Sequence, residues 1–204
     1  MTSPRVFLLS PARCDGQRTR ILLNPEAAFP LATELRSPEG APLGEVFSFL
    51  SGLYFRGKLA YAGAFAGPPA DTPAALVITT DRGLARLDDR VGPDDLRAFA
   101  QVDLAVADER FRGPLRRDLE RIQRQATPDT HFVLLGSIAT GKYADTMLEV
   151  LGERLVFPVE FVGRGDMSRG GLMLRCVSEA RELDYTAVSG ATRRGKRPPR
   201  LPRR

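Results

Sequence analysis

Three short and almost entirely apolar runs constrain the fold of this chain more than any other feature of its sequence. They occupy residues 6–9, 75–79 and 132–135, and each is bounded by polar, glycine or proline residues. Such runs are typical of strands that are buried on both faces of a sheet. Because segments with helical spacing of apolar residues lie between them, we predict an α/β protein, with a mixed α+β arrangement as the alternative. The central sheet should be mostly parallel or mixed, with helices on both faces.

The same reasoning assigns the remaining segments. Further strands are expected at residues 154–161, 172–177 and 183–188, and helices at residues 28–35, 93–99, 114–126 and 143–151. A longer helical stretch from residue 43 to 65 should be broken by Gly52 and Gly57, because glycine is unfavourable inside helices. With 204 residues, the chain is expected to form one domain over residues 1–189 and a tail over residues 190–204.

The positive charge is concentrated in that tail. The net charge is +5, but residues 193–204 hold seven of the 30 lysines and arginines, which leaves 23 basic and 25 acidic residues before them. The segment is rich in proline and poor in apolar side chains, so we expect it to be disordered. A flexible basic arm gains affinity for nucleic acid by releasing counterions. A purely solubilising role is the alternative.

Composition excludes several classes of protein. No run approaches the ~18 apolar residues of a membrane span, and the first apolar run is too short for a signal peptide, so we expect a cytoplasmic protein without a membrane partner. Cys14 and Cys176 cannot build a four-cysteine zinc site, and a single histidine excludes centres that need several. His131 opens an expected strand, which favours a surface or structural role. We therefore expect no metal and no cofactor, and we favour a monomer.

One strand-to-helix connection has the spacing of a phosphate-binding loop. Residues 136–142 read Gly-Ser-Ile-Ala-Thr-Gly-Lys, which matches G-x-x-x-x-G-K. Tyr143 follows where a nucleoside triphosphatase needs serine or threonine to hold magnesium, so NTP hydrolysis is disfavoured. The free amides of a helix start and the nearby Lys142 would still attract a phosphate, although a plain turn explains the segment equally well.

A second glycine-rich segment follows an apolar strand. Residues 163–171 contain four glycines and two arginines, Arg164 and Arg169. Glycines let the backbone approach a ligand closely, and arginines bind phosphate through two parallel hydrogen bonds. We interpret the segment as an anion-binding loop, with a solvated turn as the alternative. The glycines expected in this loop and in the preceding one are Gly136, Gly141, Gly163, Gly165 and Gly170.

The loop after the first strand, residues 10–16, is a further place where α/β proteins hold ligands. Asp15 could orient a water molecule, and Cys14 next to Arg13 could be a mildly activated thiol. These two residues are the only catalytic candidates. No partner base is evident for either, and a role of Asp15 in capping the local turn is the simpler interpretation.

Together these segments resemble the YaaA family of peroxide-stress proteins. The family's first strand is followed by S-P-A-K, which resembles Ser10-Pro11-Ala12-Arg13. Its N-L-A-S-N-E-Y element is similar to residues 136–143 in placement and in the closing Tyr143. Its A-R-G-x-M-x-R stretch resembles residues 168–175 with one residue inserted, and residues 53–57 resemble a further family turn. The segments occur in the same order over residues 5–180, whereas the lysine of S-P-A-K, the asparagines and the basic tail differ.

The resemblance implies a mixed α/β fold with a positively charged cleft, DNA binding, and protection of the cell against oxidative damage. It would assign Arg13, Lys142, Arg169 and Arg175 to the anion-binding cleft.

We therefore expect a nucleic-acid-binding protein that contacts the phosphate backbone of DNA rather than base edges. The first alternative is an enzyme acting on a nucleoside, nucleotide or nucleobase, such as a glycosidic-bond hydrolase that uses Asp15. A deep pocket beside Asp15 would favour the enzyme, and a broad basic groove would favour the binder. A module whose tail docks on an acidic protein is the third alternative.

Overall fold

A six-stranded mixed sheet forms the centre of the fold. The computed structural model describes residues 3–102 and 108–199, except for the side chain of Lys142. Three strand pairs at the centre, β1 with β3, β1 with β6 and β6 with β7, are parallel, and the outer strands are antiparallel to their neighbours. In sheet order, the strands are β4 (Leu84–Ala85), β3 (Ala75–Ile78), β1 (Arg5–Leu9), β6 (His131–Leu135), β7 (Leu155–Pro158) and β8 (Tyr185–Ala187). The predicted fold class is confirmed.

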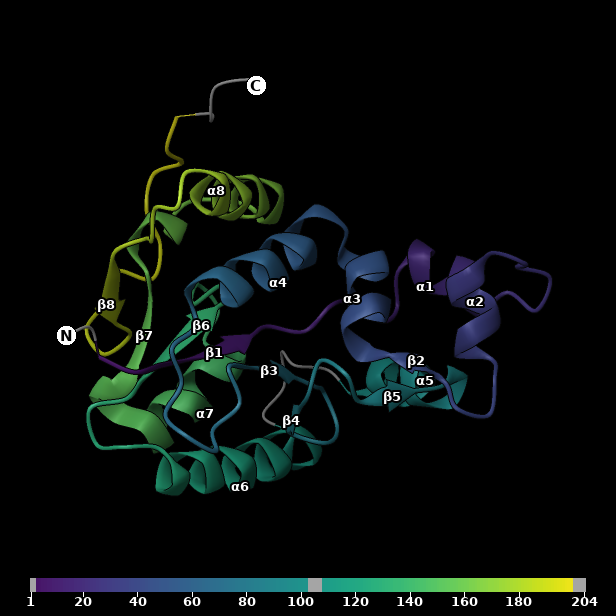
Figure 1. The fold of residues 1–204 in the computed structure, drawn as a ribbon, viewed down its shortest axis with the longest axis horizontal. Helices are drawn as coiled ribbons and strands as arrows, with labels where there is room; N and C mark the ends of the chain where they lie inside the picture. The colour runs from purple at the N-terminus through teal and green to yellow at the C-terminus, as the bar shows by residue number, and fades with distance from the viewer. Residues whose placement is uncertain (1–2, 103–107, 200–204) are drawn as a thin grey trace.

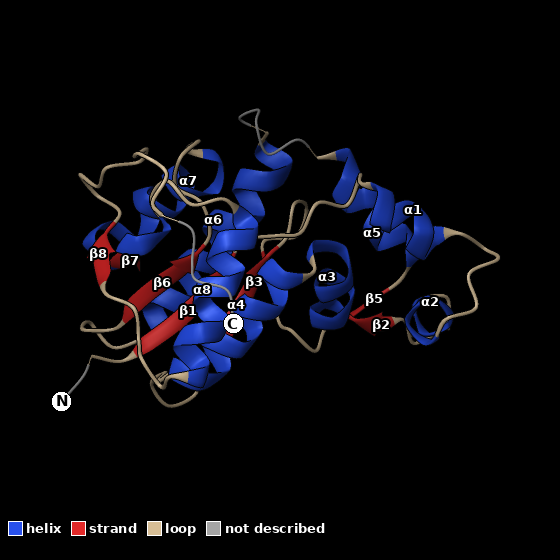
Figure 2. Ribbon diagram, turned by 90° about the horizontal axis from the view of Figure 1, so that it is seen from above, coloured by secondary structure: helices blue, strands red, loops and turns tan. Residues whose placement is uncertain are grey.

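Helices cover both faces of this sheet (Figure 1). The helices α4 (Leu53–Phe65) and α8 (Asp166–Ser178) lie on one face, and α6 (Glu109–Gln125) and α7 (Lys142–Leu151) lie on the other. The remaining helices form a smaller group beside the β4 end of the sheet, which Figure 2 shows from above. This group consists of α1 (Gln17–Leu23), α2 (Pro30–Leu35), α3 (Leu43–Ser51), α5 (Pro93–Gln101) and the two-stranded sheet of β2 (Ala41–Pro42) and β5 (Arg90–Val91).

The predicted strand at residues 172–177 is wrong, because this segment is the second half of α8. Its buried side chains, Leu172, Met173 and Cys176, recur at helical spacing and form one face. The predicted strand at residues 154–161 is shorter than expected, because a 3-10 turn over Val159–Phe161 follows Pro158. The structure also adds α1, which the sequence did not predict.

The helical stretch from residue 43 to 65 is broken at Gly52, which has a φ of 59°, but not at Gly57. Gly57 lies inside α4, where a Cβ atom would stand 2.8 Å from the carbonyl oxygen of Gly170. A Cβ on Gly170 would in turn stand 2.7 Å from the carbonyl oxygen of Leu53. The two glycines therefore let α4 and α8 pack backbone against backbone, and this contact fixes α8 over the sheet.

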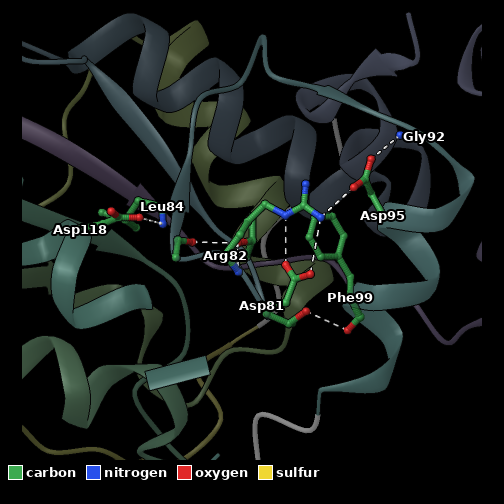
Figure 3. A network of polar contacts seen from close by, with 10 residues as sticks. Asp81, Arg82, Leu84, Gly92, Asp95, Phe99 and Asp118 are labelled. Atoms are coloured by element: carbon green, nitrogen blue, oxygen red, sulfur yellow. Dashed lines mark hydrogen bonds and ion pairs between the residues drawn. The ribbon is translucent and has the colours of Figure 1, made fainter. Parts of the chain in front are cut away.

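A polar network ties α5 and α6 to the chain that follows β3 (Figure 3). Arg82 donates to Asp81 Oδ1 at 3.1 Å and to Asp95 Oδ1 at 2.8 Å, and its guanidinium lies 4.7 Å from the centre of the Phe99 ring. On the other side of the turn, the buried carboxylate of Asp118 in α6 accepts the amide N–H of Leu84 at 3.0 Å. These contacts hold the short edge strand β4 in place.

We expect Asp118→Ala to lower the free energy of unfolding by about 1–3 kcal/mol, because it leaves the buried amide of Leu84 without an acceptor. Asp118→Asn keeps an oxygen acceptor and should cost less. Urea denaturation of both variants measures the difference. Equal losses would show that the ion pairs of Asp118 with Arg117 and Arg121, at 3.2 and 3.5 Å, dominate instead.

Candidate functional site

The register of the sheet brings two loops together at its carboxyl edge. Leu9 at the end of β1 pairs with Leu135 at the end of β6, so the next residues, Ser10 and Gly136, lie side by side. The amide of Ser10 donates to the carbonyl of Leu135 at 3.2 Å. Ligands of open α/β sheets gather at this edge.

Lys58 of α4 reaches this edge from above the sheet and is fully buried. Its Nζ lies 2.6 Å from Ser10 Oγ and 2.9 Å from the Ser10 carbonyl oxygen, and 4.0 Å from the centre of the Tyr54 ring. Burial lowers the pKa of Lys58 to about 7, an effect that Asp166 opposes and Arg169 reinforces. Burial therefore favours the neutral form of the Lys58 amine.

Two buried phenols complete the cluster. Tyr143, in the first turn of α7, accepts the amide N–H of Ser137 at 3.0 Å. Burial raises the pKa of Tyr143, and hydrogen bonds with Ser10 and the Ser137 amide partly offset it. Burial also raises the pKa of Tyr54, and the neighbouring guanidinium of Arg169 partly offsets this effect.

Arg169 lies in α8 and not in a loop, which corrects the prediction for residues 163–171. Its side chain is buried, and its Nε and Nη2 both donate to the carbonyl of Phe161 at 3.2 Å. Its carboxylate partner, Asp166, is exposed and 3.4 Å away. Gly170 is likewise helical and serves the contact with α4. Only the first part of the expected glycine loop, with Gly163 and Gly165, is a loop.

A small hollow opens at this edge of the sheet, with a cavity volume of about 10 Å³, which is room for about one water molecule. Ligand sites for whole drug-sized molecules measure roughly 300–1,000 Å³, so this hollow can contact a phosphate oxygen at its mouth but encloses neither a phosphate nor a nucleoside. Its lining combines backbone of the β6 loop with two arginines and apolar side chains: Gly136, Ser137, Ile138, Phe157, Phe161, Val162, Arg169 and Arg193.

The described part of the tail, residues 190–199, contains no helix or strand, and its Arg193 lines this hollow. Arg193 forms an ion pair with Asp145 of α7 at 2.6 Å, and Arg194 donates to the carbonyl of Ala139 at 3.4 Å. The backbone of Lys196 lies against Gly163, which has a φ of 72°. Residues 200–204 of the predicted tail lie outside the described residues.

The catalytic candidates of the first loop lie away from the hollow. Arg13 projects into solvent and donates to both carboxylate oxygens of Asp15 at 2.8 Å, and this pairing lowers the pKa of Asp15. Cys14 is buried, and burial raises its pKa to about 12, with Asp15 and Asp81 adding to the effect. Neither an activated thiol nor a base of raised pKa is present here, and Asp15 is absent from the lining of the hollow.

The other predicted anion-binding residues are only partly brought together. Arg164 donates to the Glu160 carbonyl at 2.9 Å and to Ser168 Oγ at 3.2 Å, just before α8. Arg175 lies six residues after Arg169 in α8, about 9 Å along the helix axis, and does not line the hollow. Lys142 begins α7, and its side chain lies outside the described part of the chain. Gly141 precedes α7 with a φ of 71°.

Sequence reasoning missed Lys58 and Tyr54. Both lie in the helical stretch that was interpreted as mostly core, which is where the structure places them. The available signal was a lysine in a stretch of apolar spacing, since lysine is almost never fully buried without a role or a partner. His131, at the start of β6, lies at the opposite, amino end of the strand.

The fold and the site define a mixed α/β protein with a buried lysine and an arginine-lined hollow at the carboxyl edge of its sheet. Comparison with known proteins adds no relative, since no family model, no curated protein and no solved structure matches the chain. Among the described residues, no helix is long and apolar enough to cross a membrane, and no group of histidine, cysteine or acidic side chains is arranged to hold a metal ion.

Proposed function

We propose that the chain binds the phosphates of nucleic acid at the carboxyl edge of its sheet, with little preference for base sequence. The observation that carries the proposal is that Arg169 of α8 and Arg193 of the tail line one small hollow beside the backbone of Gly136 and Ser137. A guanidinium matches the oxygens of a phosphate with two parallel hydrogen bonds. Contacts of this kind position the backbone and carry no sequence information.

The start of α7 adds to the attraction. The helix has ten residues, and Gly141 at its N-terminal end supplies no side chain to cap the first amides. The positive end of the helix dipole favours an anion nearby. The ion pair of Arg193 with Asp145, in the first turn of α7, brings the basic tail to the same helix end.

The basic tail extends the same surface. Arg194, Lys196 and Arg197 are exposed, and they follow Arg193 in the chain. A run of exposed positive charges can contact successive phosphates and release their counterions. The resemblance to the YaaA family points to the same partner, DNA, and to oxidative-stress protection as the physiological role.

The second candidate function is that of an enzyme acting on a nucleotide or a related ester. The observation that favours it is the buried contact between Ser10 and Lys58, since a lysine whose pKa burial lowers, beside a serine hydroxyl, is more typical of an active site than of a surface that only binds.

A salt titration of DNA binding tests the first proposal. We expect the wild-type chain to bind labelled duplex DNA with an affinity that falls steeply with salt. Replacing both Arg193 and Arg194 with alanine should flatten the log–log slope by roughly 0.9 for each phosphate that the variant no longer neutralises. Fluorescence anisotropy at several salt concentrations measures affinity and slope together.

The matched control is the double variant Arg97→Ala/Arg124→Ala. It removes two exposed charges as well, one from α5 and one from the end of α6, just before β6 begins at the other edge of the sheet. We expect this variant to keep nearly the wild-type slope. If both double variants lose affinity equally, or if the wild-type chain binds no DNA, the proposed site is refuted.

A further inference from the structure

We propose that a groove between α3, α4 and the start of β3 binds a small organic cation, which consists of an apolar body and one protonated amine. The groove has a volume of about 690 Å³, against about 10 Å³ for the carboxyl-edge hollow. Sites for drug-sized ligands measure roughly 300–1,000 Å³. The proposal goes beyond phosphate binding, because no residue that lines the hollow also lines this groove.

The fold brings several segments together around the groove. β4 runs antiparallel to β3, so the chain that follows Ala85 returns toward the start of β3. There the carbonyl oxygen of Leu87 accepts the amide N–H of Gly44 at 2.9 Å, which fixes this segment against the first turn of α3. Both of these residues line the groove. Its walls are therefore held by backbone contacts and are formed before a ligand binds.

The lining of the groove is largely apolar. Leu59, Ala62 and Gly63 line it from α4, and their spacing of three and four residues places them on one face of the helix. Ala74 and Ala75 line it from the start of β3. A Cβ atom on Gly63 would meet nothing within 4 Å, so this face of α4 borders open space. An apolar ligand body placed there would be removed from water, which is favourable.

The charges at the groove favour a cation. One basic and two acidic side chains line it, and Arg86 pairs with Asp88 at 3.0 Å. The remaining charge is Glu45, which is exposed and whose carboxylate has no hydrogen bond or ion pair within the described part of the chain. The lining therefore carries a net charge of one negative unit, and Glu45 is available to an amine.

The end of α4 adds to this preference. Gly63 lies in the last turn of the helix, where the final carbonyl groups carry the negative end of the helix dipole. No basic side chain occupies that turn. A protonated amine in the groove would therefore be attracted by both Glu45 and the helix end, whereas a carboxylate or a phosphate would be repelled by both.

Three probes of similar shape test the proposal. Phenylbutylamine is a cation at neutral pH, phenylbutanol is neutral, and phenylbutyrate is an anion. NMR titration of the isotope-labelled full chain measures the affinity for each probe and identifies the amides that it shifts. We expect shifts at Gly63, Ala74 and Ala75. The amine should bind at least about threefold more tightly than the alcohol, as one partly exposed ion pair provides, and the acid should bind more weakly than the alcohol.

Glu45→Gln removes the charge and nearly keeps the shape of the side chain. This variant should bind the amine and the alcohol about equally, with the affinity for the alcohol unchanged. Glu120→Gln is the matched control. It removes an exposed carboxylate from α6, on the other face of the sheet, and should keep the wild-type preference for the amine.

Gly63→Leu tests the apolar part of the groove. Its side chain would occupy the space that the ligand body needs, so the amine and the alcohol should both bind at least about tenfold more weakly. Ala64→Leu adds the same side chain at the next residue, which is exposed and lies about 100° further around the helix. It should bind both probes like the wild type. Circular dichroism establishes that the variants are folded.

Several results would overturn the proposal: no probe binds, the shifted amides lie outside the groove, the alcohol or the acid binds as tightly as the amine, or Gly63→Leu binds like the wild type. Analytical ultracentrifugation tests another occupant. A wild-type dimer that Gly63→Leu dissociates would assign the groove to a second copy of the chain instead. DNA binding at the carboxyl edge is unaffected by any of these outcomes, because the salt titration measures it separately.

Discussion

Between about pH 7.5 and 9.5, we expect the free energy of unfolding of the wild-type chain to rise relative to that of Lys58→Met, by up to about 1.4 kcal/mol per pH unit. The pKa of Lys58 is lowered by burial to about 7 in the folded chain, against 10.5 for an ordinary lysine. In this window the unfolded chain therefore holds a proton that the folded chain has released. Raising the pH lowers the cost of releasing that proton on folding and so stabilises the folded state.

Urea denaturation of both chains at several pH values measures the effect. The buried tyrosines titrate in both chains, so the difference between the two curves isolates Lys58. Below the folded pKa and above the unfolded pKa, the two curves should run parallel. Parallel curves throughout the window would mean that Lys58 stays charged when buried, and the second candidate function would lose the observation that favours it.

The second large effect is expected at the contact between α4 and α8. Gly57→Ala should lower the free energy of unfolding by about 1–3 kcal/mol or more, because its Cβ would stand 2.8 Å from the backbone of Gly170. Gly63 lies in the same helix, and a methyl group at that position would meet nothing within 4 Å. Gly63→Ala should therefore stabilise the chain by about 0.5–1 kcal/mol through helix propensity.

Thermal and urea denaturation of the two variants, measured side by side, separates packing from propensity. The opposite signs are the expected result. If Gly57→Ala were neutral or stabilising, the two helices would not be in backbone contact, and the position assigned to Arg169 over the sheet edge would be wrong.

The strands at the centre of the sheet could be predicted because their residues are apolar on both faces, as at Phe7 and Val133, and such runs are short and bounded by loop residues. Leu172 to Val177 looks similar in isolation, but the residues before it belong to the same helix. Two adjacent glycines, Gly170 and Gly171, suggested a loop. This segment packs as a helix against Gly57 of α4, which is more than 100 residues away in the sequence. Local sequence patterns do not reveal such a contact.

Part of the candidate site could be predicted from the sequence, and part could not. The position of Gly136 near a sheet edge follows from strand order, since loops after parallel strands meet at one edge. Arg169 was expected in such a loop but lies in α8. Lys58 could not be assigned, because only the packing of α4 over β1 shows that its amine ends on Ser10. Arg13 was expected at the site but binds its neighbour Asp15, a local pairing that no strand pattern reveals.

The two outer strands have a consequence for self-association. β4 has two residues and β8 has three, and both run antiparallel to the longer strands that they cover. A strand this short offers few unpaired amide and carbonyl groups on its outer side. A strand from a second copy of the chain would therefore form few hydrogen bonds there. The strongly apolar inner strands, which would otherwise promote cross-β stacking, can be reached only after an outer strand has detached.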